Sequence, residues 1–295
     1  MTTEATWVES GALQARIDEL WDFDDPAASE SRFRVAAGDA AIDRQRDILM
    51  TQVARALGLQ DRYAEGMAIL DAIPKADGDL EVEVRTRLER GRILNTRGDR
   101  DEARPEFDAA FDGATNAELE NLAVDALHMI AIVAPADEQL ALSERAIALA
   151  NAATDPRARR WLASLYNNTA WTHFDAGNLD EALRLFELAL DERVKVNKPR
   201  ETGIARWAVA RTLRAQGRTD EALAAQRDLK RFNAEAGIDD SYVEEELGEC
   251  LLALGRLDEA RPHFAKAAEG ISADAWMLAN KPARIARLQE LGRTA

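Results

Sequence analysis

The feature of this sequence that most constrains its fold is a six-residue pattern, Gly-x-x-Asp-Glu-Ala, which occurs four times. The glycines of the four copies are separated by 79, 40 and 38 residues, so the first gap is about two periods long. Repetition at a period of this length indicates a chain built by stacking one small structural unit. The copies are Gly98–Ala103, Gly177–Ala182, Gly217–Ala222 and Gly255–Ala260.

Two weaker copies complete the series. Ala136–Gln139 lies inside the long first gap, and Tyr63–Gly66 lies upstream of the four strong copies. When all copies are aligned on the alanine of the pattern, this position falls at residues 66, 103, 139, 182, 222 and 260. The sequence therefore predicts about six repeats, at steps of 36 to 43 residues.

Each copy of the pattern contains the residues that end one helix and begin the next. Glycine adopts the left-handed backbone that closes a helix, and the helix dipole stabilises Asp and Glu in a first turn. Apolar residues recur at three- and four-residue spacing on both sides, for example over 161–176 and 179–193. One helix pair cannot bury its apolar faces alone, whereas stacked pairs can. We therefore predict an all-α solenoid of antiparallel helix pairs.

The residues around the pattern resemble the tetratricopeptide repeat (TPR) family, which carries a small residue on the first helix and Ala-x3-Phe on the second. Ala-x3-Phe occurs as Ala103/Phe107, Ala182/Phe186 and Ala260/Phe264, and the small residues are Gly91, Ala170, Ala210 and Gly248. The steps exceed the usual period of about 34 residues, and Gln226 replaces the phenylalanine in one copy. The chain is thus similar to the extended variants of the family. This resemblance implies a right-handed superhelical solenoid.

The sequence predicts three segments along the chain. Residues 39–271 form the helix-pair array. Residues 1–38 supply N-terminal capping helices, including an amphipathic one from Trp7 to Phe23, and residues 272–295 supply one C-terminal capping helix. We expect Trp276 and Leu278, together with Ile285, Leu288 and Leu291, to cover the last repeat. Caps are required because the ends of a stack would otherwise expose core.

Composition disfavours other classes of protein. The formal net charge is −16, which repels phosphate backbones, so we expect no nucleic-acid partner. The longest apolar stretch, about 126–136, is much shorter than the roughly 20 residues that span a bilayer. The amino terminus lacks the features of a secretory signal. We therefore expect a cytoplasmic protein with no membrane partner.

Motifs for catalysis, cofactors or metals are absent from the sequence. The three histidines have no His-x-x-x-His spacing, there is no Cys-x-x-Cys pair, and no nucleotide-binding glycine loop is present. We interpret His173 as structural and the single cysteine, Cys250, as a buried apolar thiol. The acidic run Glu244–Glu246 does not share one helix face, and we interpret it as a solvated surface. We expect no enzyme activity, no cofactor and no metal.

The resemblance implies that the first helix of each pair lines a concave groove. Two features recur at groove positions: aromatic side chains on three successive first helices, and arginines beside them. Such residues often dominate binding energy, and arginine pairs well with carboxylates. The candidate partner-binding residues are Arg85, Arg92, Asn95, His128, Asn167, Trp171, Trp207, Arg211, Arg214 and Tyr242.

Two structural explanations compete with ligand contact at these positions. In the first explanation, Trp171 and Trp207 fill space between adjacent repeats. In the other, Arg211 and Arg214 pair with acids of the next repeat, such as Glu245 or Glu249. Both alternatives stay open on the sequence alone.

The leading functional hypothesis is a non-enzymatic scaffold or adaptor that holds a protein or peptide segment, acidic and partly apolar, in the groove. The alternative is a sensor that changes its pitch when a peptide binds and acts on a separate protein. An enzyme and a self-assembling protein are the remaining hypotheses. A surface rich in aromatic and arginine side chains favours the scaffold.

Overall fold

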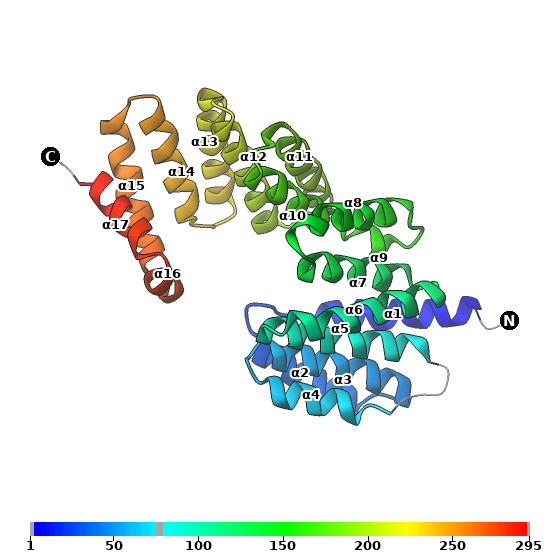
Figure 1. The fold of residues 1–295 in the computed structure, drawn as a ribbon. Coiled ribbons are helices and arrows are strands. Elements are labelled where there is room, and N and C mark those ends of the chain that lie inside the picture. The colour runs from blue at the N-terminus through cyan, green and yellow to red at the C-terminus, as the bar shows by residue number, and fades with distance from the viewer. Residues whose placement is uncertain (1–2, 75–78, 294–295) are drawn as a thin grey trace. The chain divides into compact units, whose positions relative to one another are not determined.

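The structure is a computed structural model that describes residues 3–74 and 79–293, with side chains described from residue 11 onward. Within these ranges the chain forms helices and no strand (Figure 1). The predicted all-α class is confirmed. Internal contacts divide the chain into two compact units, unit 1 from Met1 to Trp161 and unit 2 from Leu162 to Ala295.

Six helix pairs form the repeats, and each pair coincides with one copy of the sequence pattern. In unit 1 they are α3 (Asp43–Gly58) with α4 (Tyr63–Ala72), α5 (Leu80–Arg97) with α6 (Arg100–Asn116), and α7 (Glu120–Val133) with α8 (Ala136–Ala152). In unit 2 they are α10 (Leu162–Asp175) with α11 (Leu179–Lys195), α12 (Pro199–Ala215) with α13 (Thr219–Glu235), and α14 (Ser241–Ala253) with α15 (Leu257–Ser272).

The glycine of each strong copy closes the first helix of its pair, as predicted. Gly98, Gly177, Gly217 and Gly255 have φ angles of 98°, 79°, 78° and 73°, which lie in the left-handed region that favours glycine. The next residue then donates its backbone N–H back into the last turn; Asp99 N, for example, lies 2.9 Å from Leu94 O. The chain thereby reverses within about two residues, which places the second helix against the first.

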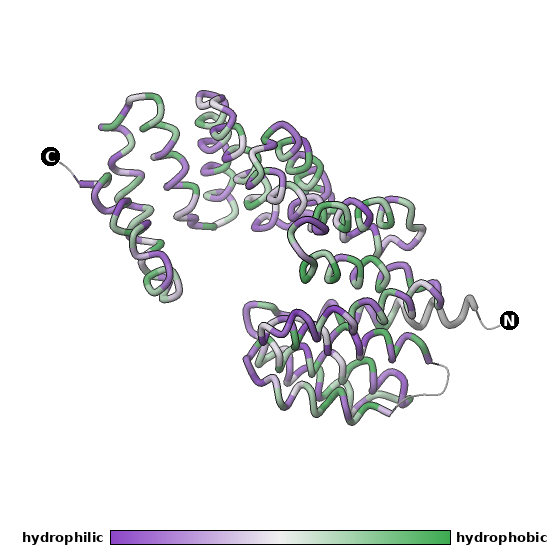
Figure 2. The backbone as a smooth tube through the Cα atoms, viewed as in Figure 1, coloured by the Kyte–Doolittle hydropathy of each residue, from purple (hydrophilic) through white to green (hydrophobic). Residues whose placement is uncertain are grey.

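The core of each repeat is built from the aromatic and small residues of the pattern. Phe107, Phe186 and Phe264 are fully buried. A Cβ atom on Gly91 would lie 2.5 Å from Cε1 of Phe107, so this ring occupies the space that a larger residue would need. Figure 2 shows that hydrophobic residues extend around most of α7, whereas most other helices alternate between hydrophobic and hydrophilic residues. Accordingly, eleven residues of α7 are buried.

The longest repeat step contains a short extra helix, α9 (Pro156–Arg159). The Asp155 side chain accepts a hydrogen bond from the backbone N–H of Arg157 at 2.8 Å, and Pro156 supplies a preset φ angle for the first turn. This insertion accounts for the 43-residue step between the third and fourth copies.

Helices also form at both ends of the array. α1 (Thr3–Leu20) and α2 (Pro26–Gly38) lie within the segment predicted to cap the N-terminus, although the side chain of Trp7 is outside the described residues. The single C-terminal helix predicted from the sequence is wrong: α16 (Ala275–Asn280) ends before Pro282, which begins α17 (Pro282–Leu291). The division into caps and array stays a prediction.

The C-terminal residues expected to cover the last repeat do so only in part. Ile285 and Leu288 of α17 are buried in the core of unit 2. Trp276 and Leu278 are 60% and 51% exposed, contrary to expectation, and Met277 between them is buried instead. In this short helix, only the face that carries Met277 meets the repeat.

Candidate protein-interaction site

Three aromatic rings lie side by side on the first helices of unit 2. We call Trp171 on α10, Trp207 on α12 and Tyr242 on α14 the aromatic strip. The Trp171 and Trp207 ring centroids are 6.2 Å apart, and those of Trp207 and Tyr242 are 6.5 Å apart. Trp171 and Trp207 are half-buried and Tyr242 is exposed. The strip therefore combines packing between repeats with accessible ring surface.

Sequence register explains why the rings meet. Relative to the small residue of its repeat, Trp171 lies one position later, Trp207 three positions earlier and Tyr242 six positions earlier. Each ring is thus about one helical turn before the ring on the preceding first helix. The aromatic strip consequently runs obliquely across α10, α12 and α14.

Contacts between repeats hold the strip, as the packing alternative predicted. The indole N–H of Trp207 donates to the backbone oxygen of Tyr242 at 3.2 Å. Trp171 contacts the Trp207 ring of the next repeat, and within its own repeat it packs edge-on against Phe186 and Phe174, with ring centroids 4.9 and 5.2 Å away. The structural role and an exposed face are compatible, so these contacts do not rule out ligand binding.

Arg211 and Arg214 share a single carboxylate. Arg211 Nη1 lies 2.6 Å from Glu246 Oε1, while Arg214 donates to both oxygens of Glu246 at 2.8 and 2.9 Å. The alternative of pairing with an acid of the next repeat is confirmed, although the acid is Glu246. Burial lowers the pKa of Arg214, but its hydrogen bond and charge interaction with Glu246 raise the pKa overall. Two cations on one carboxylate leave one unit of positive charge.

The Arg211 guanidinium also lies against the aromatic strip. Its Cζ atom is 5.3 Å from the Trp207 ring centroid and 5.7 Å from that of Phe174, which are cation–π distances. Rings and cation therefore form one continuous surface.

The acidic run is buried, which corrects our interpretation of it as a solvated surface. Glu244, Glu245 and Glu246 are 2%, 9% and 1% exposed. Their side chains leave α14 in different directions, as expected of consecutive helical residues, and each contacts basic residues on other helices. Carboxylates tolerate such burial only when paired. Their partners are Lys230, Lys266 and His263 for Glu244, Arg284 for Glu245, and Arg211 and Arg214 for Glu246.

Two further arginines of this surface, Arg284 and Arg287 on α17, were not among the residues predicted from the sequence. Arg284 lies 2.5 Å from Glu245 and 5.3 Å from the Tyr242 ring centroid, and Arg287 pairs with Glu249. The available signal was their three-residue spacing, which repeats that of Arg211 and Arg214. The remaining candidate in unit 2, Asn167, is half-buried and donates to Asn168 at 3.2 Å.

The candidate residues of unit 1 are largely enclosed. Arg85 is only 6% exposed, contrary to our expectation of an open groove position, because it lies between Glu81 and Gln14. Arg92 pairs with Glu89 at 2.5 Å and with Asp125 of the next repeat. Among these candidates, Asn95 is half-buried near the end of α5.

His128 is a buried candidate of unit 1. Burial lowers its pKa despite the nearby carboxylate of Asp125, so the imidazole is neutral near pH 7. Its ring centroid is 5.6 Å from that of Trp161, whose indole N–H donates to Asn121 at 3.0 Å. These contacts are those of a packed core residue.

Groups with reactive chemistry are few in the part of the chain that the structure describes. Cys250 is fully buried, as predicted, and burial raises the pKa of its thiol to about 12. A thiol in this state is a poor nucleophile. The described residues include no cluster of three or more side chains able to hold a metal ion. Nor do they include a helix long and apolar enough to cross a membrane.

Models of a known family match segments of the chain that contain these helix pairs. One tetratricopeptide repeat model matches residues 161–231, and a second matches residues 84–109 and 245–266. The chain contains tetratricopeptide repeats. These matches cover the helix pairs of unit 2 and the pair α5–α6, which confirms the resemblance inferred from the glycine and Ala-x3-Phe patterns. A sequence search of the curated proteins found no match.

Solved structures with the same fold include two Rap proteins and BtubC. The apo form of RapI superposes with a TM-score of 0.67 at 11% identity, over 90% of this chain and 77% of RapI. A Rap protein in complex with competence and sporulation factor gives 0.52 at 15%, over 96% and 99% of the two chains. BtubC from P. vanneervenii gives 0.58 at 16%, over 75% and 94%. At these identities the likeness concerns the fold.

A tetratricopeptide repeat fold suggests a scaffold for protein–protein interaction, and scaffolds of this family are typically non-enzymatic.

Proposed function

We propose that this protein is a non-enzymatic scaffold that binds a peptide or protein segment on the aromatic strip of unit 2. The observation that carries the proposal is that Trp171, Trp207 and Tyr242 form a continuous row with accessible ring surface on three successive first helices. Large aromatic side chains held rigidly by their neighbours bind at low entropic cost. An extended segment laid across the row would contact all three repeats.

Charge around the strip favours a segment that carries a carboxylate. Four arginines, Arg211, Arg214, Arg284 and Arg287, face three acids, Glu245, Glu246 and Glu249. The set has an excess of one positive charge within a chain of net charge −16. Arg211 is the best placed to accept a ligand carboxylate, because its side chain is one-third exposed and it lies against the Trp207 ring.

A chain of similar fold, a Rap protein, was solved in complex with competence and sporulation factor. We infer for the present protein a comparable recruitment of a small proteinaceous ligand, on the grounds of its own aromatic strip. The alternative function is a sensor that acts on a separate protein when its ligand binds. The aromatic strip spans three repeats, so a ligand bound along it would favour one spacing of these repeats over others.

Selection from a displayed random peptide library tests the site. We expect the wild-type chain to enrich peptides that combine apolar and acidic residues, and the W207A/R211A variant to lose them at least tenfold. A matched variant, W276A/R231A, removes an exposed tryptophan and an exposed arginine elsewhere in unit 2 and should retain them. Enrichment of the same peptides on all three proteins would place binding away from the strip.

A further inference from the structure

Three arginines of the chain occupy the same register in their repeats. Arg55 on α3, Arg92 on α5 and Arg211 on α12 each lie 11 residues before the alanine position of the sequence pattern. Side chains at equivalent positions of similar helices start in equivalent directions, so their surroundings decide what each one does. The three arginines differ in how far neighbouring groups use their hydrogen-bond donors.

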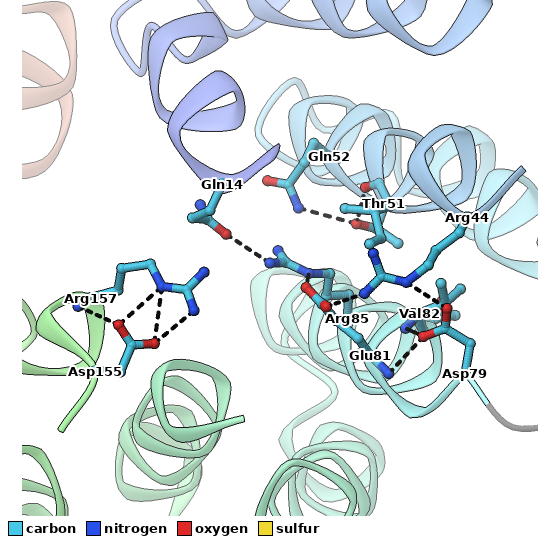
Figure 3. Close-up of polar contacts among 12 residues, drawn as sticks. Gln14, Arg44, Thr51, Gln52, Asp79, Glu81, Val82, Arg85, Asp155 and Arg157 are labelled. Atoms are coloured by element: carbon cyan, nitrogen blue, oxygen red, sulfur yellow. Dashed lines mark hydrogen bonds and ion pairs between the residues drawn. The ribbon is translucent and has the colours of Figure 1, made fainter. Parts of the chain in front are cut away.

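Several enclosed arginines of unit 1 are held by hydrogen bonds and ion pairs. Arg44 pairs with Asp79 and Glu81, and Arg85 donates to Glu81 and Gln14 (Figure 3). A guanidinium carries five N–H donors, and burying donors without acceptors lowers stability. Such pairing is what we expect of an arginine with a structural role.

Arg92 follows this rule, whereas Arg55 does not. Arg92 pairs with Glu89 and with Asp125, and its side chain is 13% exposed. Among the described residues, the Arg55 guanidinium finds no hydrogen-bond acceptor, and its ion pair with Glu89 is 4.0 Å long. The Arg55 side chain is 28% exposed. Arg55 therefore offers unused donors that a ligand can reach.

Glu89 serves Arg92 rather than Arg55. Its Oε1 atom accepts a hydrogen bond from Arg92 at 2.5 Å, and its Oε2 atom is buried without a hydrogen-bond partner among the described residues. Burial lowers the pKa of Arg55, and the charge of Arg92 lowers it further. The carboxylates of Glu89 and Asp125 offset these effects only in part. A further anion beside Arg55 would stabilise its charged form.

Two aromatic rings flank the Arg55 guanidinium. Its Cζ atom is 5.5 Å from the Trp21 ring centroid and 5.4 Å from that of Phe23, and the two rings stack with centroids 4.6 Å apart. The indole N–H of Trp21 donates to Gln52 at 3.0 Å, which holds this ring in place. Phe23 is 59% exposed. Aromatic and arginine side chains on an accessible surface often dominate binding energy.

Arg211 of unit 2 has comparable surroundings. Its guanidinium lies against the rings of Phe174 and Trp207. Its Nη1 atom donates to Glu246, while its Nε atom has no partner among the described residues. An arginine that lies against two rings and has donors to spare thus occurs at the same register in each unit.

We propose that Arg55, Trp21 and Phe23 form a second ligand site, in unit 1, which binds a carboxylate carried beside an aromatic or large apolar side chain of a peptide. The unused N–H donors of Arg55 would hold both carboxylate oxygens. The neighbouring side chain of the ligand would lie on the exposed Phe23 ring. The site takes all its residues from unit 1, so it does not depend on the aromatic strip.

Nuclear magnetic resonance on the full chain tests the site. The reporter is the indole N–H signal of Trp21, identified by its absence from the W21F variant. The Trp207 indole signal reports separately on the aromatic strip. The probes are three acetylated tripeptides: Phe-Glu-Phe amide, Phe-Gln-Phe amide, and Phe-Gln-Phe with a free C-terminus.

Two variants separate the Arg55 guanidinium from a general loss of charge. R55Q removes this guanidinium. R145Q is the matched control, because Arg145 is an exposed arginine whose Cζ atom lies 5.0 Å from the Phe111 ring centroid elsewhere in unit 1. We expect Phe-Glu-Phe amide to bind R55Q with a Kd at least tenfold higher than for the wild-type and R145Q chains.

A comparison of probes on the wild-type chain gives a second test that needs no variant. Phe-Gln-Phe amide should bind at least tenfold more weakly than Phe-Glu-Phe amide. Tighter binding of the free-terminus peptide than of the glutamate peptide would identify a chain terminus as the source of the carboxylate, and the reverse order an acidic side chain. Equal Kd values for the two amides, or for wild-type and R55Q, would overturn the proposal. So would the absence of a saturable Trp21 shift with every probe.

Discussion

At the residue scale, a phenylalanine ring packed against the first helix explains why that helix carries glycine at the contact. Gly91 faces Phe107, and a Cβ atom there would lie 2.5 to 2.8 Å from three ring atoms. Helix propensity alone favours alanine over glycine by about 1 kcal/mol. Overpacking a well-filled core costs about 1–3 kcal/mol. The steric term is larger here because the ring is fully buried and has no free space to move into.

We therefore predict that G91A lowers the free energy of unfolding by about 1–2 kcal/mol, measured by urea denaturation followed by circular dichroism. The control is G11A in α1, where no atom lies within 4 Å of the added Cβ. This change should be neutral or slightly stabilising. A stabilised G91A protein would show that Phe107 can be displaced.

Gln226 occupies the position where three other repeats have phenylalanine. It is fully buried, and neither atom of its amide has a hydrogen-bond partner among the described residues. An unpaired buried polar group costs about 1–3 kcal/mol. This residue is a local weakness in the core of α12 and α13.

Q226M keeps the length and flexibility of the side chain and removes both unpaired atoms. We predict that it raises the free energy of unfolding by about 1–2 kcal/mol, with a higher melting temperature in calorimetry. Q216M makes the same chemical change at a residue that bonds Asp180 at 2.8 Å near the surface, and should give no gain. A destabilised Q226M would mean that the amide is hydrogen-bonded to ordered water.

At the element scale, α14 is held to α13 and α15 through the carboxylate of Glu244. Glu244 receives His263 at 2.6 Å, Lys230 at 2.9 Å and Lys266 at 3.1 Å. Burial raises the pKa of Glu244, but these hydrogen bonds outweigh it and lower the pKa to about 2. The ionised form is therefore stabilised by folding, and this contribution is complete above the ordinary pKa of 4.5.

Consequently, stability should fall as the pH drops from about 4.5 to 2, where Glu244 takes up a proton in the unfolded chain before the folded one. Allowing for solvent screening of the two lysines, the contribution is about 1–2 kcal/mol. We predict that E244Q loses this amount at pH 7 and flattens the acid limb of a stability–pH curve. E269Q, at an exposed position of α15, should leave the curve unchanged. An unaltered acid limb in E244Q would refute the assignment.

At the scale of the whole molecule, stability is expected to be local. The chain forms two compact units, and each repeat packs mainly on its neighbours in sequence. In such arrays a perturbation decays over adjacent repeats. The substitutions at Gly91 and Gln226 lie in different units, in repeats separated by two others.

Native-state hydrogen exchange should display this locality. G91A is predicted to speed exchange in α5, α6 and their neighbours, with a change of less than about threefold in α14 and α15. Q226M is predicted to slow exchange in α12 and α13 without affecting α3 and α4. Uniform acceleration of both units by G91A would show that the chain unfolds as one cooperative body.

The sequence by itself determined the repeat count, the helix pairing and the glycine turns, because these depend on local properties. A left-handed glycine, an acidic first turn and an apolar stripe act within a few residues. The register of the aromatic strip was also readable, since equivalent positions on stacked helices come together. Ala-x3-Phe located the buried rings for the same reason.

Only the tertiary structure decided which polar side chains are buried and what they contact. The burial of Arg85 depends on α1, 71 residues away, and that of Glu246 depends on arginines 32 and 35 residues away. The exposure of Trp276 and the roles of Arg284 and Arg287 likewise depend on where α16 and α17 settle. Burial is a property of the element on the other side of a side chain, and no local pattern encodes which element that is.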